Sequence, residues 1–399
     1  MTTVAATSFD IIINGGGIAG LTLAGLLRDS GLQVAVIERQ PLPPLSDEPE
    51  LRVSAIGRAS LAVFERCGAL RAMLDARATP FREMHVWDST GAGEIHFDSA
   101  EAGLDTLGYI IENNRIQHAL LQSAKAADNV TLLCPAVLQG IQREQDAVQV
   151  TLESGERLQA RLLVGADGVN SPVRRFAAID YPLRSYKQKA LVCAVATELP
   201  HQHTAWQIFL PGGPLAFLPL FASDGRDQCS IVWSLPESEA DCLLALEDDD
   251  FEQRLQEAFE YRLGDVQLTS PRAAFPLRHG HAAQTAQANL ALIGDAAHII
   301  HPLAGQGANL GIIDAAELAD VITGAHGRGR QWWAQHTLRR YERARKGENL
   351  VMETAMSGFN LLFSNDNAWL AMLRNAGLNL VDHAPVLKQQ FMRVTGARG

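Results

Sequence analysis

The sequence predicts a protein of the α/β class. A short β-branched run, a glycine-rich turn, a helical pattern and a second short strand follow one another over residues 10–39. Alternating apolar and aromatic residues over 189–233 predict an antiparallel sheet, and the pattern beyond residue 324 is mostly helical. We therefore expect a Rossmann-type domain interwoven with an antiparallel-sheet domain and followed by a helical C-terminal segment.

The first strand, Asp10–Asn14, ends directly at the glycine turn. Gly15, Gly17 and Gly20 have GxGxxG spacing between a strand and a helix, and Glu38 ends the next strand. This context is typical of a dinucleotide site, because the glycines admit a pyrophosphate, the helix N-terminus attracts its charge, and the carboxylate can bind a ribose. The predicted contacts of this turn are Gly15, Gly17, Ile18, Ala19, Gly20, Glu38 and Arg39.

The chain continues as a mixture of strand and helix patterns. In chain order we predict a proline-rich loop at 41–50, a helical stretch at 53–74, a hairpin at 81–99, a helix at 115–127, strands between 130 and 168, the antiparallel segment, an acidic helical stretch at 237–262 and a strand that begins at 289.

The composition argues against several classes of protein. A net charge of −11 gives no support for a nucleic-acid binder, which usually carries a basic stripe. Five scattered cysteines without CxxC spacing predict reduced thiols in a cytoplasmic protein. The first nine residues lack Lys and Arg, unlike a signal peptide, and no apolar run is long enough for a transmembrane helix. Contact with a membrane surface stays open.

The segment Gly294–Ile322 has three interpretations: a metal site, an ordinary turn into a helix, or a cradle for a large ligand. A metal would need His298 and His301 on one face with a third ligand, and the intervening residues fit this poorly, so we predict no metal. Clustered glycines instead indicate close approach of the backbone to a ligand. Successive N–H groups ahead of a helix suit an anionic group, and they belong to Gly305, Gln306, Gly307, Ala308 and Asn309.

Two further motifs carry a resemblance to a known family. "LLVGADGVNSPVRR" at 162–175 and "ALIGDAAH" at 291–298 each read as a strand that ends in a Gly–Asp or Asp–Gly pair. Together with the glycine turn they resemble the three fingerprints of the FAD-dependent aromatic hydroxylases, the p-hydroxybenzoate-hydroxylase-like enzymes. The resemblance implies that FAD is the cofactor, that Asp295 binds its ribityl chain, and that Asp167 lies near FAD and the route of NAD(P)H.

Additional stretches, among them "GYIIENNRIQHALL", "FLPLF" and "LRRYERARKGEN", resemble the ubiquinone-biosynthesis subgroup and, within it, most of all the 2-polyprenylphenol 6-hydroxylases. The resemblance implies that Pro302, His301 and Gly305 lie at the reacting flavin ring. It also implies contacts of Arg52 and Arg115 with FAD phosphates or the flavin region. Leu138 falls where the family has a backbone contact to adenine, although ordinary sheet packing is an open alternative.

The same resemblance implies a FAD-dependent monooxygenase that hydroxylates the aromatic ring of a polyprenylphenol intermediate in ubiquinone biosynthesis. NAD(P)H or another external reductant would reduce FAD, and dioxygen as co-substrate would form a flavin C4a-hydroperoxide. Another ring position, another phenol, a FAD-dependent prenyl-lipid reductase and a non-enzymatic subunit of a quinone-making assembly stay open as alternatives. A pocket lining for the substrate, with plain sheet core as its alternative, is predicted at Phe217, Pro219, Leu220 and Trp233.

We expect a discontinuous FAD-binding domain at 1–78, 104–180 and 276–322, a substrate domain at 79–103 and 181–275, and a helical segment at 323–399. The C-terminal segment mixes apolar and basic positions, which leaves peripheral contact with the inner membrane or with other ubiquinone-biosynthesis proteins open. A homo-oligomer is equally open.

Overall fold

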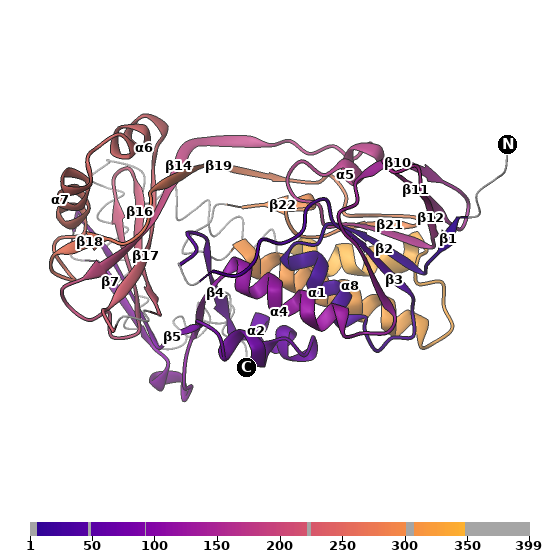
Figure 1. Cartoon of the computed structure of the whole chain (residues 1–399), viewed down its shortest axis with the longest axis horizontal. Helices are drawn as coiled ribbons and strands as arrows, with labels where there is room; N and C mark the ends of the chain where they lie inside the picture. The colour runs from indigo at the N-terminus through magenta and orange to yellow at the C-terminus, as the bar shows by residue number, and fades with distance from the viewer. Residues whose placement is uncertain (1–5, 47–48, 92, 222–224, 301–306, 348–399) are drawn as a thin grey trace.

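The computed structural model describes residues 6–46, 49–91, 93–221, 225–300 and 307–347. It contains a helix-rich part and a sheet-rich part, and the two long strands β14 (Arg184–Thr197) and β19 (Ala273–His281) run from one to the other (Figure 1). Among the described residues, no helix combines the length and apolarity that crossing a membrane requires.

The helix-rich part is built on a six-stranded sheet. In spatial order its strands are β20 (Ala286–Gln287), β21 (Leu290–Leu292), β13 (Leu162–Gly165), β2 (Ile11–Asn14), β3 (Val34–Ile37) and β9 (Val130–Leu133). All neighbours from β21 to β9 are parallel, and the central strands are buried on both faces. Such strands read as continuous apolar runs, which is why "IIIN" and "VAVI" form them.

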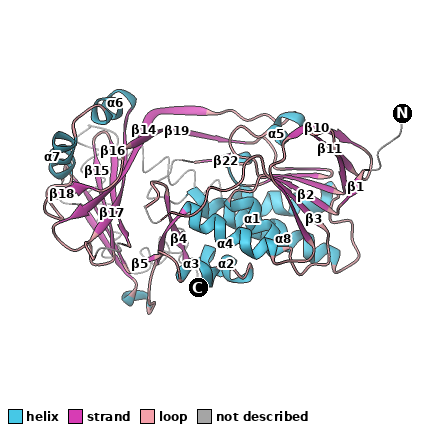
Figure 2. Cartoon of the chain, in the orientation of Figure 1, coloured by secondary structure: helices cyan, strands magenta, loops and turns pink. Residues whose placement is uncertain are grey.

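The two faces of this sheet are covered by different layers. Ile11 and Ile13 pack with α1 (Ile18–Leu26), α4 (Asn113–Lys125) and α8 (Gly307–His326), whereas Ile12 faces the opposite side. Figure 2 shows these helices gathered below the sheet. The opposite layer is a four-stranded sheet with the order β1 (Thr7–Ser8), β12 (Arg157–Ala160), β11 (Val148–Leu152) and β10 (Leu138–Arg143), joined by α5 (Pro172–Phe176).

The sheet-rich part is a nine-stranded sheet. Its main path runs β22 (His298–Ile299), β19, β14, β17 (Gln228–Pro236), β16 (Gly213–Leu220), β15 (Thr204–Leu210), β6 (Glu83–Asp88) and β7 (Glu94–Asp98), and β18 (Val266–Leu268) pairs with β14. The predicted antiparallel sheet and hairpin are confirmed. The pairing of β15 with β6 is parallel, which the alternation pattern could not reveal.

Both faces of the nine-stranded sheet are also covered. One packs under α6 (Glu237–Leu244) and α7 (Asp248–Ala258). The other packs against a three-stranded sheet of β4 (Val53–Gly57), β8 (Gly108–Glu112) and β5 (Thr79–Phe81), which lies between the two parts of the molecule. We call the apolar core between these two sheets the inner layer. Its buried residues are Ala55, Phe81, Ile95, Phe97, Leu107, Ile110, Ala194, Ala205, Phe209, Ala216, Leu218 and Leu220.

The expected helical stretch at 53–74 is wrong at its start. Residues Val53–Gly57 form β4, because they pair with β8, and the helices α2 (Arg58–Arg66) and α3 (Leu70–Leu74) follow. A helix covers 335–347 in the described part of the C-terminal segment, while 348–399 lie outside the described residues. The domain boundaries given above stay a prediction.

Candidate cofactor and substrate site

The carboxyl ends of three neighbouring parallel strands bring the three fingerprints to one edge of the six-stranded sheet. The glycine turn follows β2, Asp167 follows β13, and Asp295 follows β21. Asn14, at the end of β2, donates from Nδ2 to Asp167 Oδ2 at 2.8 Å and ties two of the loops together. This edge is where open α/β sheets bind ligands.

The glycines of the turn serve two different purposes. Gly15 has φ +115°, and a Cβ there would lie 2.3 Å from the Ala166 carbonyl oxygen, while a Cβ on Gly20 would lie 2.0 Å from the Gly15 carbonyl oxygen. These two positions need glycine for close packing of strand and helix. A Cβ on Gly17 meets nothing within 4 Å among the described residues, so this position faces open space.

Helix α1 begins beside that space. Ile18 and Ala19 form its first turn, and its N-cap, Gly17, has no side chain that could accept a hydrogen bond. The described first turn also contains no acidic residue. Its free N–H groups and positive dipole end are therefore available to an anion.

Glu38 lies beside the glycine turn at the end of β3. Its Oε2 accepts from Gly16 N–H at 2.6 Å and its Oε1 from Gln40 N–H at 3.0 Å, so the carboxylate shapes the turn and keeps acceptor capacity for a ribose. Gln117 on α4 donates to the Gly16 carbonyl oxygen at 3.2 Å. Sequence reasoning missed the role of Gln117, because its partner Gly16 is 101 residues away in the chain. Arg39 is exposed next to Glu38.

Asp167 has an incomplete set of hydrogen bonds. Its Oδ2 accepts from Asn14 and from Val173 N–H at 3.2 Å, whereas its buried Oδ1 meets no donor with hydrogen-bonding geometry in the described part of the chain. Burial raises the pKa of Asp167. A buried acceptor without a partner costs free energy, which a ligand donor at this position would recover.

Asp295 follows Gly294, whose φ of +59° turns the chain out of β21. Its side chain is reached by water, yet surrounding protein atoms desolvate it and raise its pKa. His298 and Arg52 oppose this shift, which places the Arg52 guanidinium near the carboxylate. An acceptor that is both enclosed and accessible suits hydrogen bonds to ligand hydroxyls.

A buried ionic network holds the Asp295 loop in place. Asp314 on α8 is completely buried, and its Oδ2 accepts from Gly294 N–H at 3.0 Å and from His298 Nε2 at 2.6 Å. Its Oδ1 accepts from Arg345 Nε at 2.6 Å. Burial raises the pKa of Asp314, but the charges of His298 and Arg345 outweigh burial, and the net shift is downward. His298 thus helps to position this loop. Asp314 and Arg345 lie within stretches discussed above, but their bonds to this loop could not be predicted because the partners are distant in the chain.

The start of α8 is fixed by Asn309. Its Oδ1 accepts from Ser60 Oγ at 2.7 Å and Gly57 N–H at 3.2 Å, and its Nδ2 donates to the Ala55 carbonyl at 2.7 Å. The side chain is therefore committed to β4 and α2. Gly307 and Ala308 open the helix, and a Cβ on Gly307 meets nothing within 4 Å in the described residues. The predicted residues outside the described ranges are His301, Pro302, Gly305 and Gln306.

The remaining predicted contacts differ in their environment. Arg52 is exposed, and its guanidinium lies 5.9 Å from the Phe275 ring centroid. Arg115 pairs with the buried Glu112 and donates to the Ser46 carbonyl at 3.0 Å. The Leu138 side chain packs in the core between the two sheets, and the segment just before it is bonded to the backbone of Glu38.

The predicted substrate residues lie on both faces of the nine-stranded sheet. Phe217 is completely buried and stacks on Phe259 with ring centroids 3.7 Å apart, and Trp233 shares this core under α7. Pro219 is on the same face by alternation. The structure thus places Phe217 and Trp233 in the core under α7 and away from the inner layer, as plain sheet packing would. Leu220 belongs to the inner layer.

Taken together, these groups fit a dinucleotide such as FAD. As far as the chain is described, the edge offers an open glycine position, an uncapped helix N-terminus, a carboxylate oxygen without a hydrogen-bond partner and an accessible second carboxylate. Within the described ranges, no group of three or more His, Cys, Asp and Glu side chains could hold a metal ion. Fold and site together define a dinucleotide-binding protein with a second, sheet-rich part.

Comparison with known proteins gives the family. The model of the FAD binding domain family matches residues 8–353. The chain is 39% identical to the 3-demethoxyubiquinol 3-hydroxylase of Escherichia coli, over 96% of this chain and 97% of that protein. It is 32% identical to the human ubiquinone biosynthesis monooxygenase COQ6, over 97% of this chain and 92% of that protein.

Comparison with solved structures supports the same fold. The Pseudomonas aeruginosa PqsL structure in complex with 2-aminobenzoylacetate superposes with a TM-score of 0.77 at 26% identity, covering 94% of this chain and 100% of PqsL. The chain belongs to the FAD-dependent aromatic hydroxylase family and, within it, to the ubiquinone-biosynthesis subgroup. FAD is its cofactor.

Proposed function

We propose that this protein is a monooxygenase that hydroxylates the aromatic ring of a polyprenylphenol intermediate of ubiquinone biosynthesis. The observation that carries the proposal is the convergence of the glycine turn, Asp167 and Asp295 at one sheet edge. Relatives that span nearly the whole chain and are named as ubiquinone hydroxylases support it.

Each group at the edge would have a defined task in holding FAD. The N-terminus of α1 and Gly17 would hold the pyrophosphate, Glu38 a ribose, and Asp295 the ribityl hydroxyls. The start of α8, fixed by Asn309, would direct N–H groups at the flavin ring and stabilise negative charge there. When bound, FAD supplies the electron transfer and the activation of dioxygen.

The apolar inner layer would keep water away from the reacting ring. It is formed by side chains of the nine-stranded sheet and of the sheet β4–β8–β5, and its core members are buried. Exclusion of water protects reactive intermediates from side reactions such as hydrolysis. NAD(P)H or another external reductant would deliver the electrons, with dioxygen as co-substrate.

Two ring positions are candidates. The resemblance of the sequence motifs favours position 6 of a 2-polyprenylphenol. The Escherichia coli relative, at 39% identity, is named for hydroxylation at position 3 of 3-demethoxyubiquinol, and it favours another position. Deletion of the gene in a ubiquinone-making host is expected to accumulate a prenylphenol that lacks one hydroxyl, and mass spectrometry of this intermediate identifies the position. An unaltered quinone pool would contradict the pathway assignment.

The proposal includes a location and partners. We propose a cytoplasmic protein that meets its lipid-tailed substrate at the inner membrane as a peripheral protein, alone, as a homo-oligomer or with other ubiquinone-biosynthesis proteins. Fractionation of cell lysates tests this. Release from the membrane fraction by high salt is the expected result for peripheral binding, whereas extraction only by detergent would contradict it.

A further inference from the structure

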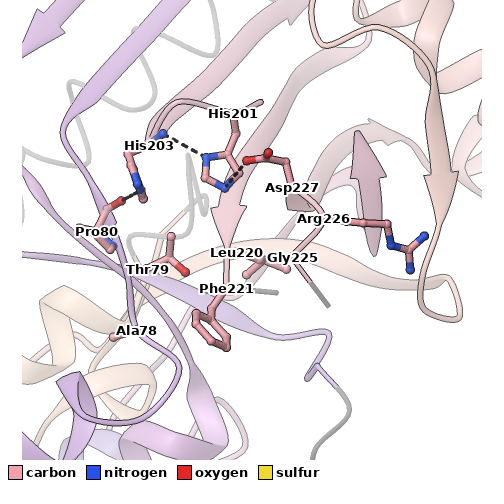
Figure 3. A pocket seen from close by; sticks show the side chains of 10 residues that line it. All are labelled: Ala78, Thr79, Pro80, His201, His203, Leu220, Phe221, Gly225, Arg226 and Asp227. Carbon is pink, nitrogen blue, oxygen red and sulfur yellow. Dashed lines mark hydrogen bonds and ion pairs between the residues drawn. The ribbon is translucent and has the colours of Figure 1, made fainter. Parts of the chain in front are cut away.

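A pocket of about 260 Å³ opens beside the inner layer (Figure 3). It lies where β5 meets the turn before β15 and the end of β16. Apolar lining comes from Pro80, Leu220 and Phe221. The polar lining consists of Thr79, His201, His203, Arg226 and Asp227. A site that combines an apolar wall with a few fixed polar groups is typical of small-molecule binding.

The hydrogen bonds of the pocket fix which nitrogen of each histidine carries a proton. The backbone N–H of His203 donates to His201 Nδ1 at 3.0 Å, so His201 carries its proton on Nε2 and directs it to Asp227 Oδ1 at 3.3 Å. His203 Nδ1 lies 3.2 Å from the Pro80 carbonyl oxygen, which can only accept. Neutral His203 therefore has a lone pair on Nε2, and this atom has no partner in the described part of the chain.

The turn that carries His203 has an unusual backbone. Gln202 and His203 both have left-handed φ angles, 56° and 58°. Two consecutive non-glycine residues in this region cost free energy, and such conformations concentrate at functional sites. The pair of Asp227 and His201 holds this turn in place and thereby fixes the direction of the His203 ring (Figure 3).

The pocket is close to the proposed cofactor edge. Ala55 on β4, whose carbonyl binds Asn309, lies directly opposite Ile110 on β8, and Ile110 lies opposite Thr79 on β5, which lines the pocket. Two strand spacings separate Ala55 from Thr79, roughly 10 Å. Thr79 is 5% exposed, and its hydroxyl has no hydrogen-bond partner among the described residues. A ligand in the pocket would supply one.

We propose that this pocket binds the hydroxyl-bearing edge of the phenolic substrate, with His203 Nε2 as the acceptor of the phenol hydrogen bond. This makes His203 a specificity-determining residue and rests on the proposed function. The ring packs against Pro80 and Leu220, and its hydroxyl donates to His203. An ether at the same ring position lacks the donor and leaves the imidazole nitrogen unsatisfied, so the pocket distinguishes phenols from their ethers.

The test compares 2-allylphenol with its methyl ether, 2-allylanisole, by calorimetric titration of the FAD-loaded protein. The wild type is expected to bind the phenol about five- to ten-fold more tightly, the value of one hydrogen bond. His203→Phe, which removes the acceptor and keeps an aromatic ring, is expected to bring this ratio to about one. His96→Phe, a histidine on β7 outside the pocket, is the matched control and is expected to keep the wild-type ratio.

FAD absorbance and thermal unfolding show whether each variant is folded, and if His203→Phe is not, the ratio is measured on His203→Ala. Incorporation of labelled dioxygen is measured on the same preparations. Label in the product together with a ratio that does not depend on His203 would overturn the pocket assignment and leave the proposed function standing. If the phenol-to-ether affinity ratio falls to one in the variant but the wild-type product carries no label, the pocket assignment stands and the proposed monooxygenase activity is contradicted.

Discussion

A substitution at Gly17 is expected to affect binding of FAD without affecting the fold. The φ of this residue is −75°, and a Cβ there would meet no described protein atom within 4 Å, so neither backbone conformation nor close packing requires glycine at this position. Gly17→Val is therefore expected to fold normally and to lose bound FAD, because the side chain fills the space for the pyrophosphate. The absorbance of the purified protein measures this. Gly140→Val, at an equally open glycine on β10, is the control; a yellow Gly17→Val protein would contradict the assignment.

Loss of the Asp295 carboxylate is expected to weaken FAD binding rather than abolish it. Asp295→Ala is expected to weaken FAD binding by roughly ten- to hundred-fold, the range for the loss of a charged hydrogen-bond acceptor. Fluorescence titration of the FAD-free protein gives the dissociation constant. Asp180→Ala, at an exposed aspartate before β14, should leave this constant unchanged. If Asp295→Ala and wild type have the same dissociation constant for FAD, the proposed contact with the ribityl chain is contradicted.

Local motifs indicated candidate residues that the structure brings to one sheet edge. The glycine turn could be recognised from its spacing between a strand and a helix, and Asp167 and Asp295 from the resemblance to the family, while their contacts with FAD stay a prediction. Asn14 could be recognised only as the end of the first strand, and its bond to Asp167 depends on a strand pairing across 153 residues. The roles of Gln117, Asp314 and Arg345 were missed for the same reason, since their partners are distant in the chain.

Helix α8 depends on a buried charge network. Asp314→Asn leaves Arg345 without its full countercharge and is expected to lower the free energy of unfolding by roughly 3–5 kcal/mol. Denaturant titration measures the loss. The control is Asp320→Asn, on the same helix in a surface pair with Arg66, where a change below about 1 kcal/mol is expected.

The network also predicts a pH dependence with a definite sign. The pKa of Asp314 is lower in the folded protein than its ordinary value, so its stabilising effect is present above an unfolded pKa of about 3.9 and is lost as the pH falls through the folded pKa. The stability difference between wild type and Asp314→Asn should shrink as the pH falls below about 4 toward the folded pKa of Asp314. A difference that grows on acidification would contradict the charge assignment.

Substitutions on the two faces of β16 are expected to have different effects, one on stability and the other on the KM. Phe217→Ala removes a stacked ring from the core under α7 and is expected to cost roughly 3–5 kcal/mol of stability, with the KM for a short-chain prenylphenol unchanged. Leu220→Ala, on the inner layer beside the pocket, is expected to raise that KM. Steady-state kinetics and denaturant titration of both variants check this; a raised KM in Phe217→Ala alone would reverse the assignment of the faces.

Sequence periodicity could identify β16 but not its orientation. All eight residues of the strand are buried, so alternation gives no outside face, and only the position of α6 and α7 decides which side chains face the inner layer. Similarly, Val53–Gly57 has no helix-breaking residue before its end and becomes a strand because β8 offers a partner. Tertiary pairing overrides local preference at both places.

For the whole molecule, the resemblance of the motifs predicted the fold class correctly, because proteins that share these three fingerprints share a fold. It could not predict the His201–Asp227 pair or the left-handed turn at His203, which arise where two sheets meet. The carbonyl of Ala55, a residue of the apolar inner layer, binds Asn309 at the start of α8, and the proposed hydroxylation of a lipid-tailed phenol would need such a contact between an apolar layer and the cofactor edge.

Labelled dioxygen tests this account most directly. The purified FAD-loaded protein, a reductant, a short-chain prenylphenol and ¹⁸O₂ are expected to give a hydroxylated product that contains one labelled oxygen atom and forms only when FAD is bound. An oxidised or reduced substrate without label, with all labelled oxygen recovered as peroxide or water, would contradict it.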